Sequence, residues 1–333
     1  MRFTDIVLNG QKFQMPAISL GTVWFGSKTT KEMSFSLMDT YEGLGGNWID
    51  TARQYGPAVF PKHELKDKYD SEEVVGDWMK SRGNRNSITL ITKGANADAR
   101  TGEKRRLTPQ AIRSDIEESL KLLKTSWTDI YFVHTDDESV PVEQVMPVLH
   151  ELVQSGKTRV IGASNWRVSR IEAANRFAME NGLTPFSLSQ VRWSYALPCF
   201  DNRERAFDME LDPTQYEWYK REKMPIMAYS SQARGFFLKT AENGFEPENI
   251  GRSASYLNDE NVNRAKAVHA LAKRLGISTS AAALSYLWGK EIPVTALCTG
   301  NTPENVRKTL EDCDFYPSKS DIEELENARN KTL

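Results

Sequence analysis

The chain has 333 residues, of which 39% are hydrophobic and 26% charged, and its formal net charge at pH 7 is −2. This ordinary composition indicates a folded globular protein with a sizeable core and excludes a disordered or fibrous chain. Because positive and negative charges nearly balance, the sequence offers no basic field for nucleic acid or an anionic membrane, and neither is expected as a partner.

A β-hairpin is predicted at the start of the chain. Residues 4–8 and 12–15 flank Asn9-Gly10, the dipeptide that favours a tight two-residue turn between antiparallel strands. We expect this hairpin to lie as a lid over the N-terminal ends of the strands that follow it.

Eight short apolar segments rich in β-forming residues follow the hairpin. They cover residues 18–20, 48–49, 88–91, 130–133, 160–163, 188–191, 226–229 and 295–298. Segments with helical periodicity lie between them, and Thr108-Pro109 and Thr302-Pro303-Glu304 are typical helix starts. Such alternation predicts parallel strands, and eight units can close a (β/α)8 TIM barrel. No change of composition divides the chain, so residues 1–333 are predicted to form one barrel domain.

One long segment interrupts this alternation, between the seventh predicted strand and the next helical pattern near Val262. Residues 231–259 contain Gly235, Gly244 and Gly251 together with several Ser and Asn residues. This composition predicts a loop, and loops of such length in a compact domain are usually functional lids.

The cysteines and the N-terminus indicate the cellular compartment. Cys199, Cys298 and Cys313 are odd in number and irregularly spaced, which suits neither a disulfide framework nor a metal site. We expect reduced thiols and no metal. The first residues form no apolar run, and nowhere do about 18 apolar residues follow one another. A cytoplasmic protein is therefore expected.

Polar residues directly after the predicted strands are the candidates for chemistry, because parallel barrels carry their active sites at the C-terminal ends of the strands. Asp50 ends the second segment and Tyr55 lies five residues further on. Lys93 ends the third segment and His134 the fourth. The four side chains are therefore expected to meet at one mouth of the barrel.

Proton affinities suggest what this set can do. A tyrosine has a pKa of about 10, and a lysine ammonium nearby lowers that pKa by favouring the phenolate. Asp50 would keep Lys93 protonated and fix its direction, while His134 would hydrogen-bond a carbonyl oxygen. Tyr55 could then protonate that oxygen as a hydride reaches the carbon. The hydride must come from a cofactor, since no side chain supplies one.

These positions resemble the catalytic tetrad of the aldo-keto reductases in identity and spacing, and the resemblance covers nearly the whole chain. It implies an NAD(P)H-dependent oxidoreductase that interconverts an aldehyde or ketone and its alcohol on a (β/α)8 barrel. It also implies that Ser164, Asn165 and Gln190 hold the nicotinamide carboxamide, and that Tyr229 stacks on the nicotinamide ring. The cofactor-binding residues implied in this way are Thr22, Asp50, Ser164, Asn165, Gln190, Tyr229, Ser230, Gln232, Arg234, Gly300, Asn301, Thr302 and Asn305.

The sequence departs from the family in the segment expected to bind the adenosine phosphate. Thr299 and Asn305 stand where the family has Lys and Arg, while Arg307 and Lys308 lie one turn into the next helix. The N-terminus of that helix offers N–H groups and a positive dipole end to an anion. We therefore expect NADP(H) to be preferred over NAD(H), by a smaller margin than is usual in the family.

The substrate is less well defined by the sequence. Trp24 follows the first strand and is predicted to line the substrate pocket, with Trp193, Phe236 and Phe237 as further aromatic walls. Aromatic walls with polar groups nearby suit a sugar or another polyol as well as an aromatic aldehyde, and the polar run from His134 to Asp137 favours the sugar-like substrate. A second function stays open, in which the barrel senses the redox state of a bound nicotinamide and regulates a partner with little turnover. A hydrolase or lyase fits less well, because no second ligand joins Asp136 and Asp137 at metal-binding spacing.

Overall fold

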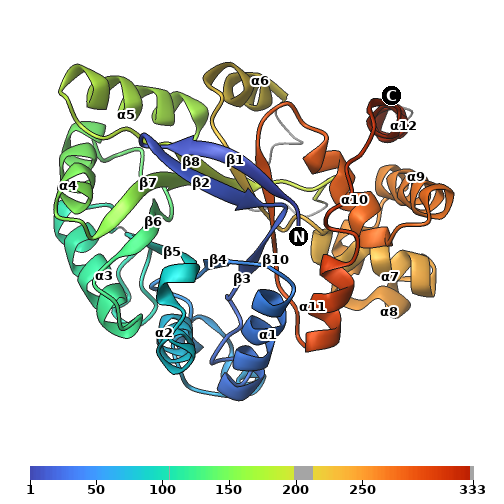
Figure 1. The fold of residues 1–333 in the computed structure, drawn as a ribbon, viewed down its shortest axis with the longest axis horizontal. Helices are drawn as coiled ribbons and strands as arrows, with labels where there is room; N and C mark the ends of the chain where they lie inside the picture. The colour runs from blue at the N-terminus through green and yellow to red at the C-terminus, as the bar shows by residue number, and fades with distance from the viewer. Residues whose placement is uncertain (105, 199–212, 331–333) are drawn as a thin grey trace.

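A computed structural model describes residues 1–104, 106–198 and 213–330 of the chain. Its centre is a closed barrel of eight parallel strands, in the order β10-β3-β4-β5-β6-β7-β8-β9, with the helices around it (Figure 1). The barrel strands are β3 (Ile18–Gly21), β4 (Trp48–Asp50), β5 (Thr89–Gly94), β6 (Thr128–Val133), β7 (Thr158–Ser164), β8 (Leu188–Arg192), β9 (Ile226–Tyr229) and β10 (Val294–Cys298). Each of the eight predicted segments forms one of these strands, so the TIM-barrel prediction is confirmed.

Helices connect the strands and cover the outside of the barrel. They are α1 (Lys31–Gly43), α2 (Ser71–Arg82), α3 (Pro109–Leu122), α4 (Val142–Gln154), α5 (Val168–Glu180), α6 (Pro213–Glu222), α7 (Phe236–Asn243), α8 (Pro247–Ile250), α9 (Asp259–Leu275), α10 (Thr279–Trp288), α11 (Pro303–Leu310) and α12 (Lys319–Asn330). Two predicted helix starts are confirmed, because the hydroxyls of Thr108 and Thr302 cap α3 and α11 by accepting a hydrogen bond from a backbone N–H of the first turn.

The predicted hairpin is confirmed as β1 (Phe3–Leu8) and β2 (Gln11–Pro16), which pair antiparallel around Asn9-Gly10. Both turn residues have positive φ, 48° and 73°, as a tight hairpin of this kind requires. In Figure 1 the hairpin lies across the barrel. Its apolar face (Ile6, Leu8, Phe13 and Met15) packs against a cluster that includes Trp48, Ile130, Val160 and Leu188. The hairpin therefore closes the N-terminal end of the barrel.

The prediction of one long loop over residues 231–259 is wrong. The segment contains the 3-10 helices η5 (Ala233–Gly235) and η6 (Gly251–Tyr256) and the helices α7 and α8. Gly235, Gly244 and Gly251 are cap residues at the ends of α7 and α8. Glycines that looked like loop residues thus end short helices, which are stabilised by buried side chains such as Phe236 and Tyr256.

Two of the three cysteines lie in the described part of the chain. Cys298 and Cys313 are buried and form no disulfide, and burial raises the pKa of the Cys298 thiol to about 12. Cys199 lies outside the described residues. Across residues 1–104, 106–198 and 213–330, no helix has both the length and the apolar composition needed to cross a membrane.

Candidate active site

The C-terminal ends of β4 and β5 bring Asp50, Lys93 and Tyr55 together. The Lys93 ammonium donates to Asp50 Oδ2 at 2.6 Å and to the Thr51 carbonyl oxygen at 2.8 Å. Its Nζ also lies 3.4 Å from the Tyr55 hydroxyl oxygen. Burial opposes the charge on Lys93, but Asp50 and Tyr55 outweigh it and raise its pKa. Lys93 is therefore a buried, charged group held between a carboxylate and a phenol.

His134 follows β6 and completes this cluster. Its ring lies edge-on to the Tyr55 ring, with 5.7 Å between the ring centroids. Burial, helped by the charge of Lys93, lowers the pKa of His134 well below its usual value, so the imidazole is neutral near pH 7. Its Nδ1 is buried and has no hydrogen-bond partner among the described residues.

The protonation of Tyr55 differs from the sequence-based expectation. Lys93 does favour the phenolate, but burial is the larger effect and raises the pKa of Tyr55 above its usual value of 10. The hydroxyl of Tyr55 therefore keeps its proton at neutral pH. A carbonyl oxygen that reaches it would meet a proton donor.

A chain of side-chain hydrogen bonds joins this cluster to residues predicted to hold the nicotinamide. The Gln190 amide donates to Asp50 Oδ1 at 2.9 Å. The Tyr229 hydroxyl donates to Asn165 Oδ1 at 2.8 Å, and Asn165 Nδ2 lies 3.2 Å from both the Ser164 hydroxyl and the His134 carbonyl oxygen. The ends of β7, β8 and β9 thus place four residues at the same mouth of the barrel as the Lys93 cluster: Ser164, Asn165, Gln190 and Tyr229.

The loop after β9 contains several residues with left-handed backbone conformation. Ser230, Ala233, Arg234 and Gly235 have φ values of 55°, 50°, 60° and 81°. Arg234 is exposed, and its guanidinium donates to the Ser255 hydroxyl at 3.1 Å. Gln232 Nε2 is buried without a partner in the described structure. A donor in that state suits an anionic group such as a pyrophosphate.

The N-terminus of α11 forms the other end of the predicted cofactor region. Gly300 is buried, and a Cβ atom there would lie 2.9 Å from Val306 Cγ2 and 3.2 Å from Val306 N. Glycine therefore lets the chain approach the start of α11. Asn301, Thr302 and Asn305 are exposed there, so their side chains are accessible to a ligand.

Thr22 is placed differently from these residues. It is fully buried, its hydroxyl donates to the Asp50 carbonyl oxygen at 3.0 Å, and it lies 2.7 Å from the Ser71 hydroxyl. The Thr22 hydroxyl therefore both donates and accepts a hydrogen bond inside the protein. A role of Thr22 at the cofactor stays a prediction.

The aromatic residues predicted to surround the substrate lie in different places. Trp24 is partly exposed after β3 and packs on Phe60, with 5.1 Å between their ring centroids. Trp193, Phe236 and Phe237 are instead buried in the hydrophobic core, so their prediction as pocket walls is wrong. Phe60 was not predicted as a site residue, because it does not directly follow a predicted strand. The one indication in the sequence was that an aromatic residue lies soon after Tyr55.

The polar run after β6 also differs from its expected role. Both carboxylate oxygens of Asp136 accept hydrogen bonds from Arg170, at 3.0 and 3.1 Å. Asp137 Oδ1 accepts hydrogen bonds from the Ser139 backbone N–H and hydroxyl. These carboxylates are already engaged, so they are not free acceptors for a sugar.

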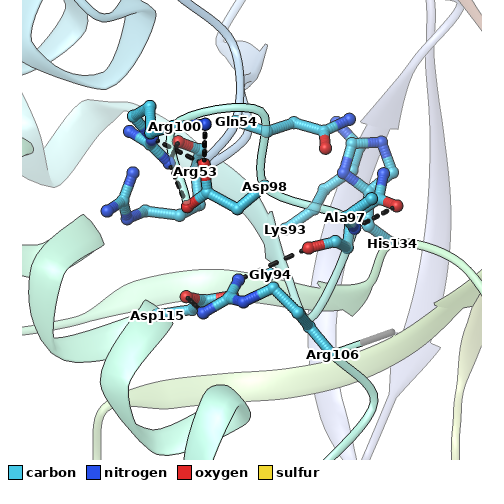
Figure 2. A pocket seen from close by; sticks show the side chains of 11 residues that line it. Arg53, Gln54, Lys93, Gly94, Ala97, Asp98, Arg100, Arg106, Asp115 and His134 are labelled. Carbon is cyan, nitrogen blue, oxygen red and sulfur yellow. Dashed lines mark hydrogen bonds and ion pairs between the residues drawn. The ribbon is translucent and has the colours of Figure 1, made fainter. Parts of the chain in front are cut away.

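A small pocket opens beside His134 and Lys93, between the loops that follow β4 and β5. Figure 2 shows Arg53, Gln54, Asp98 and Arg106 around it. Arg53 and Gln54 were not among the predicted site residues, although both stand between Asp50 and Tyr55. The feature that could have indicated them is the charged Arg53 in the loop between these two predicted catalytic residues.

The fold and the position of this cluster define a (β/α)8 barrel with titratable side chains at the strand ends, where barrel enzymes carry their active sites. A family model described as the aldo/keto reductase family matches residues 17–330. The chain therefore belongs to the aldo/keto reductase family, whose members are NAD(P)-dependent oxidoreductases.

Curated relatives match over most of their length. An aryl-alcohol dehydrogenase from Pestalotiopsis microspora is 29% identical over 323 residues, which are 93% of this chain and 76% of that protein. A norsolorinic acid reductase from Emericella nidulans is 29% identical, with 93% and 77% of the two chains covered. An aryl-alcohol dehydrogenase [NADP(+)] from Phanerodontia chrysosporium is 29% identical, with 96% and 82% covered.

Proposed function

We propose that this protein interconverts an aromatic aldehyde or ketone and its alcohol, with Tyr55 as the proton donor in reduction. The observation that carries the proposal is the position of the Lys93 ammonium, which contacts both Asp50 and the Tyr55 hydroxyl beside the neutral His134. A buried cluster of this kind combines an acid, a fixed charge and a neutral hydrogen-bond donor at one mouth.

Each of the four side chains has its own role in the proposed reaction. His134, being neutral, donates a hydrogen bond to the substrate oxygen and orients it toward Tyr55. Tyr55 gives its proton to that oxygen, and Lys93 stabilises the phenolate that remains. Asp50 keeps Lys93 charged and directed toward Tyr55. In alcohol oxidation the same groups act in reverse, with the phenolate of Tyr55 taking the proton.

The residues around the predicted cofactor region fit a nicotinamide dinucleotide. When bound, the nicotinamide supplies or accepts the hydride. Asn165, Ser164 and Gln190 are the residues that would hold its carboxamide, with Tyr229 against the ring. Two observations support binding of the phosphates between β9 and α11. The Gln232 amide nitrogen is buried without a partner among the described residues, and Gly300 lets the backbone lie close to Val306 at the start of α11.

An aromatic substrate is favoured over the sugar-like one expected from the sequence. The Trp24 and Phe60 rings pack on each other, with the Lys28 ammonium over both, and such a group of rings and a cation can pack against an aromatic ring. The carboxylates of Asp136 and Asp137, in contrast, are already hydrogen-bonded. Relatives named as aryl-alcohol dehydrogenases support the same choice.

The test is NADPH oxidation with a panel of benzaldehydes, by the wild type and by Tyr55→Phe. The variant keeps the ring and loses the hydroxyl that carries the proton, so it should lose at least about 100-fold in kcat and bind NADPH almost as the wild type does. Fluorescence titration checks the binding. If the wild type binds NADPH but turns over no carbonyl or alcohol in either direction, the redox-sensing alternative replaces the enzyme.

We further propose that NADP(H) is preferred over NAD(H), by a modest margin. Arg307 is exposed in α11 and is the residue that would contact a 2′-phosphate, while Glu304 at the helix start opposes an anion. Arg307→Ala should weaken NADPH binding by roughly tenfold, as loss of one charge-assisted hydrogen bond does, and leave NADH binding unchanged. NADH binding equal to that of NADPH in the wild type would contradict the preference.

A further inference from the structure

The pocket beside His134 has an unusual charge arrangement. Three arginines, Arg53, Arg100 and Arg106, line it together with Asp98 and Asp115. The two acids are neutralised locally. Asp115 accepts hydrogen bonds from Arg106 Nη1 and Nη2, each at 2.8 Å, and Asp98 accepts from Arg100 Nε at 2.9 Å. Of the three arginines, Arg53 alone has no buried carboxylate as its hydrogen-bond partner among the described residues.

Arg53 keeps unused donors. Its Nη2 forms an ion pair with Glu118, a side chain of α3 that is 53% exposed. Its Nε and Nη1 are buried, and neither has a hydrogen-bond partner within the described part of the chain. Buried donors without partners are rare in proteins and costly. Burial and the nearby charge of Arg100 also lower the pKa of Arg53, and a bound anion would offset this shift by favouring the charged guanidinium.

The position of this arginine relates it to the reacting atoms. Arg53 precedes Tyr55 by two residues, and its backbone N–H donates to the Lys93 carbonyl oxygen at 2.9 Å. His134 and Lys93 also line this pocket. Figure 2 shows the Gln54 amide directed toward the His134 ring. A substrate whose oxygen lies between Tyr55 and His134 would have this pocket next to its carbonyl group.

We propose that the pocket binds a carboxylate of the substrate through Arg53 and Gln54, so that the enzyme prefers aromatic carbonyl compounds bearing a carboxylate. This inference rests on the proposed function and adds a substrate class to it. A carboxylate gains charge-assisted hydrogen bonds from an arginine, whereas a neutral substituent of the same size gains weaker ones. Arg53 is thus a specificity-determining residue.

The experiment compares 2-, 3- and 4-formylbenzoate with the corresponding formylbenzamides, which have similar size and no charge, using NADPH. For at least one isomer, the wild-type kcat/KM for the formylbenzoate should exceed that for the amide by about tenfold, the worth of one charge-assisted hydrogen bond. Arg53→Met should bring this ratio close to one, and Arg53→Lys should retain part of it. The control is Arg113→Met, which removes an exposed arginine of α3 paired with Glu151 and should leave the ratio unchanged.

The measured quantity is the ratio of kcat/KM for the formylbenzoate to kcat/KM for the formylbenzamide. A variant that merely displaces Tyr55 lowers both values together and leaves this ratio unchanged. A wild-type ratio of one or less for all three isomers overturns the carboxylate site even if Arg53→Met does not fold. An unchanged ratio in a folded Arg53→Met overturns it as well. Turnover of benzaldehyde without a carboxylate preference rejects this inference alone, whereas the absence of any turnover rejects the proposed function with it.

Discussion

At the scale of single residues, Lys93 is the group on which the site depends. Its ammonium has three protons, and acceptors surround it at Asp50 Oδ2, the Thr51 carbonyl oxygen and the Tyr55 hydroxyl. The side chain is completely buried, so no water competes for these contacts. The direction of the charge is therefore fixed toward Tyr55.

Replacing this ammonium should affect the two directions of the reaction unequally. Burial raises the pKa of Tyr55, and Lys93 is the charge that lowers it, so Lys93→Met should raise it further. Alcohol oxidation needs the phenolate and should lose at least about 100-fold in kcat/KM at pH 8, while reduction loses less. Because the pKa of Tyr55 stays above its usual value of 10 in both proteins, the phenolate fraction rises in parallel with pH in both, and the loss in oxidation should persist from pH 6 to 10. Rate profiles over this range in both directions check this, and an equal loss in oxidation and reduction would contradict it.

The residues of the site differ in how visible they are in the sequence. Asp50, Lys93 and His134 each end a β-rich apolar segment, and parallel strands bring such ends to one mouth. The pocket at Arg53 was not predictable in this way, because its partners come from a loop and from α3, and sequence periodicity does not report contacts between them. The net pKa of Tyr55 also depends on burial, which only the folded structure gives.

At the scale of elements, the contact between α2 and α3 depends on one glycine. A Cβ atom on Gly76 in α2 would lie 2.3 Å from the Leu122 carbonyl oxygen and 2.8 Å from the Leu123 backbone. Backbone atoms cannot move aside as a flexible side chain can. The two helices therefore approach more closely than any larger residue would allow.

Gly76→Ala should consequently destabilise the protein, by roughly 1–3 kcal/mol for an overpacked contact, despite the better helix propensity of alanine. Gly43→Ala is the matched control, because Gly43 ends α1 and a Cβ atom there would have no heavy atom within 4 Å. That variant should be neutral or slightly stabilising. Urea unfolding of both variants is the measurement. A Gly76→Ala protein as stable as the Gly43→Ala protein would show that the helices adjust.

Most elements could be predicted from the sequence, and the exceptions have physical causes. The eight strands are short apolar segments with clear ends, and Asn9-Gly10 requires the positive φ angles that the turn has. Residues 231–259 looked like a loop because their glycines and polar residues are the same types that punctuate loops. The short helices α7 and α8 are stabilised by burial of Phe236 and Ile250 against other elements, and no local pattern reveals that.

At the scale of the whole molecule, alternation of strands and helices was enough to predict the barrel, but not the polar groups enclosed between barrel and helices. Glu72 of α2 is fully buried there, and its Oε1 accepts a hydrogen bond from the Thr92 hydroxyl of β5. Its Oε2 has no partner among the described residues. In the sequence Glu72 resembles an acidic residue in the first turn of a surface helix.

This buried acid should make the stability of the molecule depend on pH. Burial raises the pKa of Glu72 to about 7, and Thr92 opposes the shift only partly. Between its unfolded pKa, near 4.5, and about 7, the folded protein binds more protons than the unfolded chain. The contribution of Glu72 to the free energy of unfolding therefore falls by about 3 kcal/mol at most as pH rises through this window. Above the window this contribution stays constant.

Glu72→Gln removes this titration while keeping the shape of the side chain and an oxygen that accepts from Thr92. The variant should gain stability relative to the wild type between pH 5 and pH 8, because only the wild type must bury a charge at the higher pH. Urea unfolding at both pH values measures the difference, and comparison with the wild type cancels other titrating groups. Glu73→Gln, at the neighbouring and less buried position of α2, is the control and should show no such gain. If Glu72→Gln changes the free energy of unfolding equally at pH 5 and pH 8, Glu72 does not change its charge across this range in the folded protein.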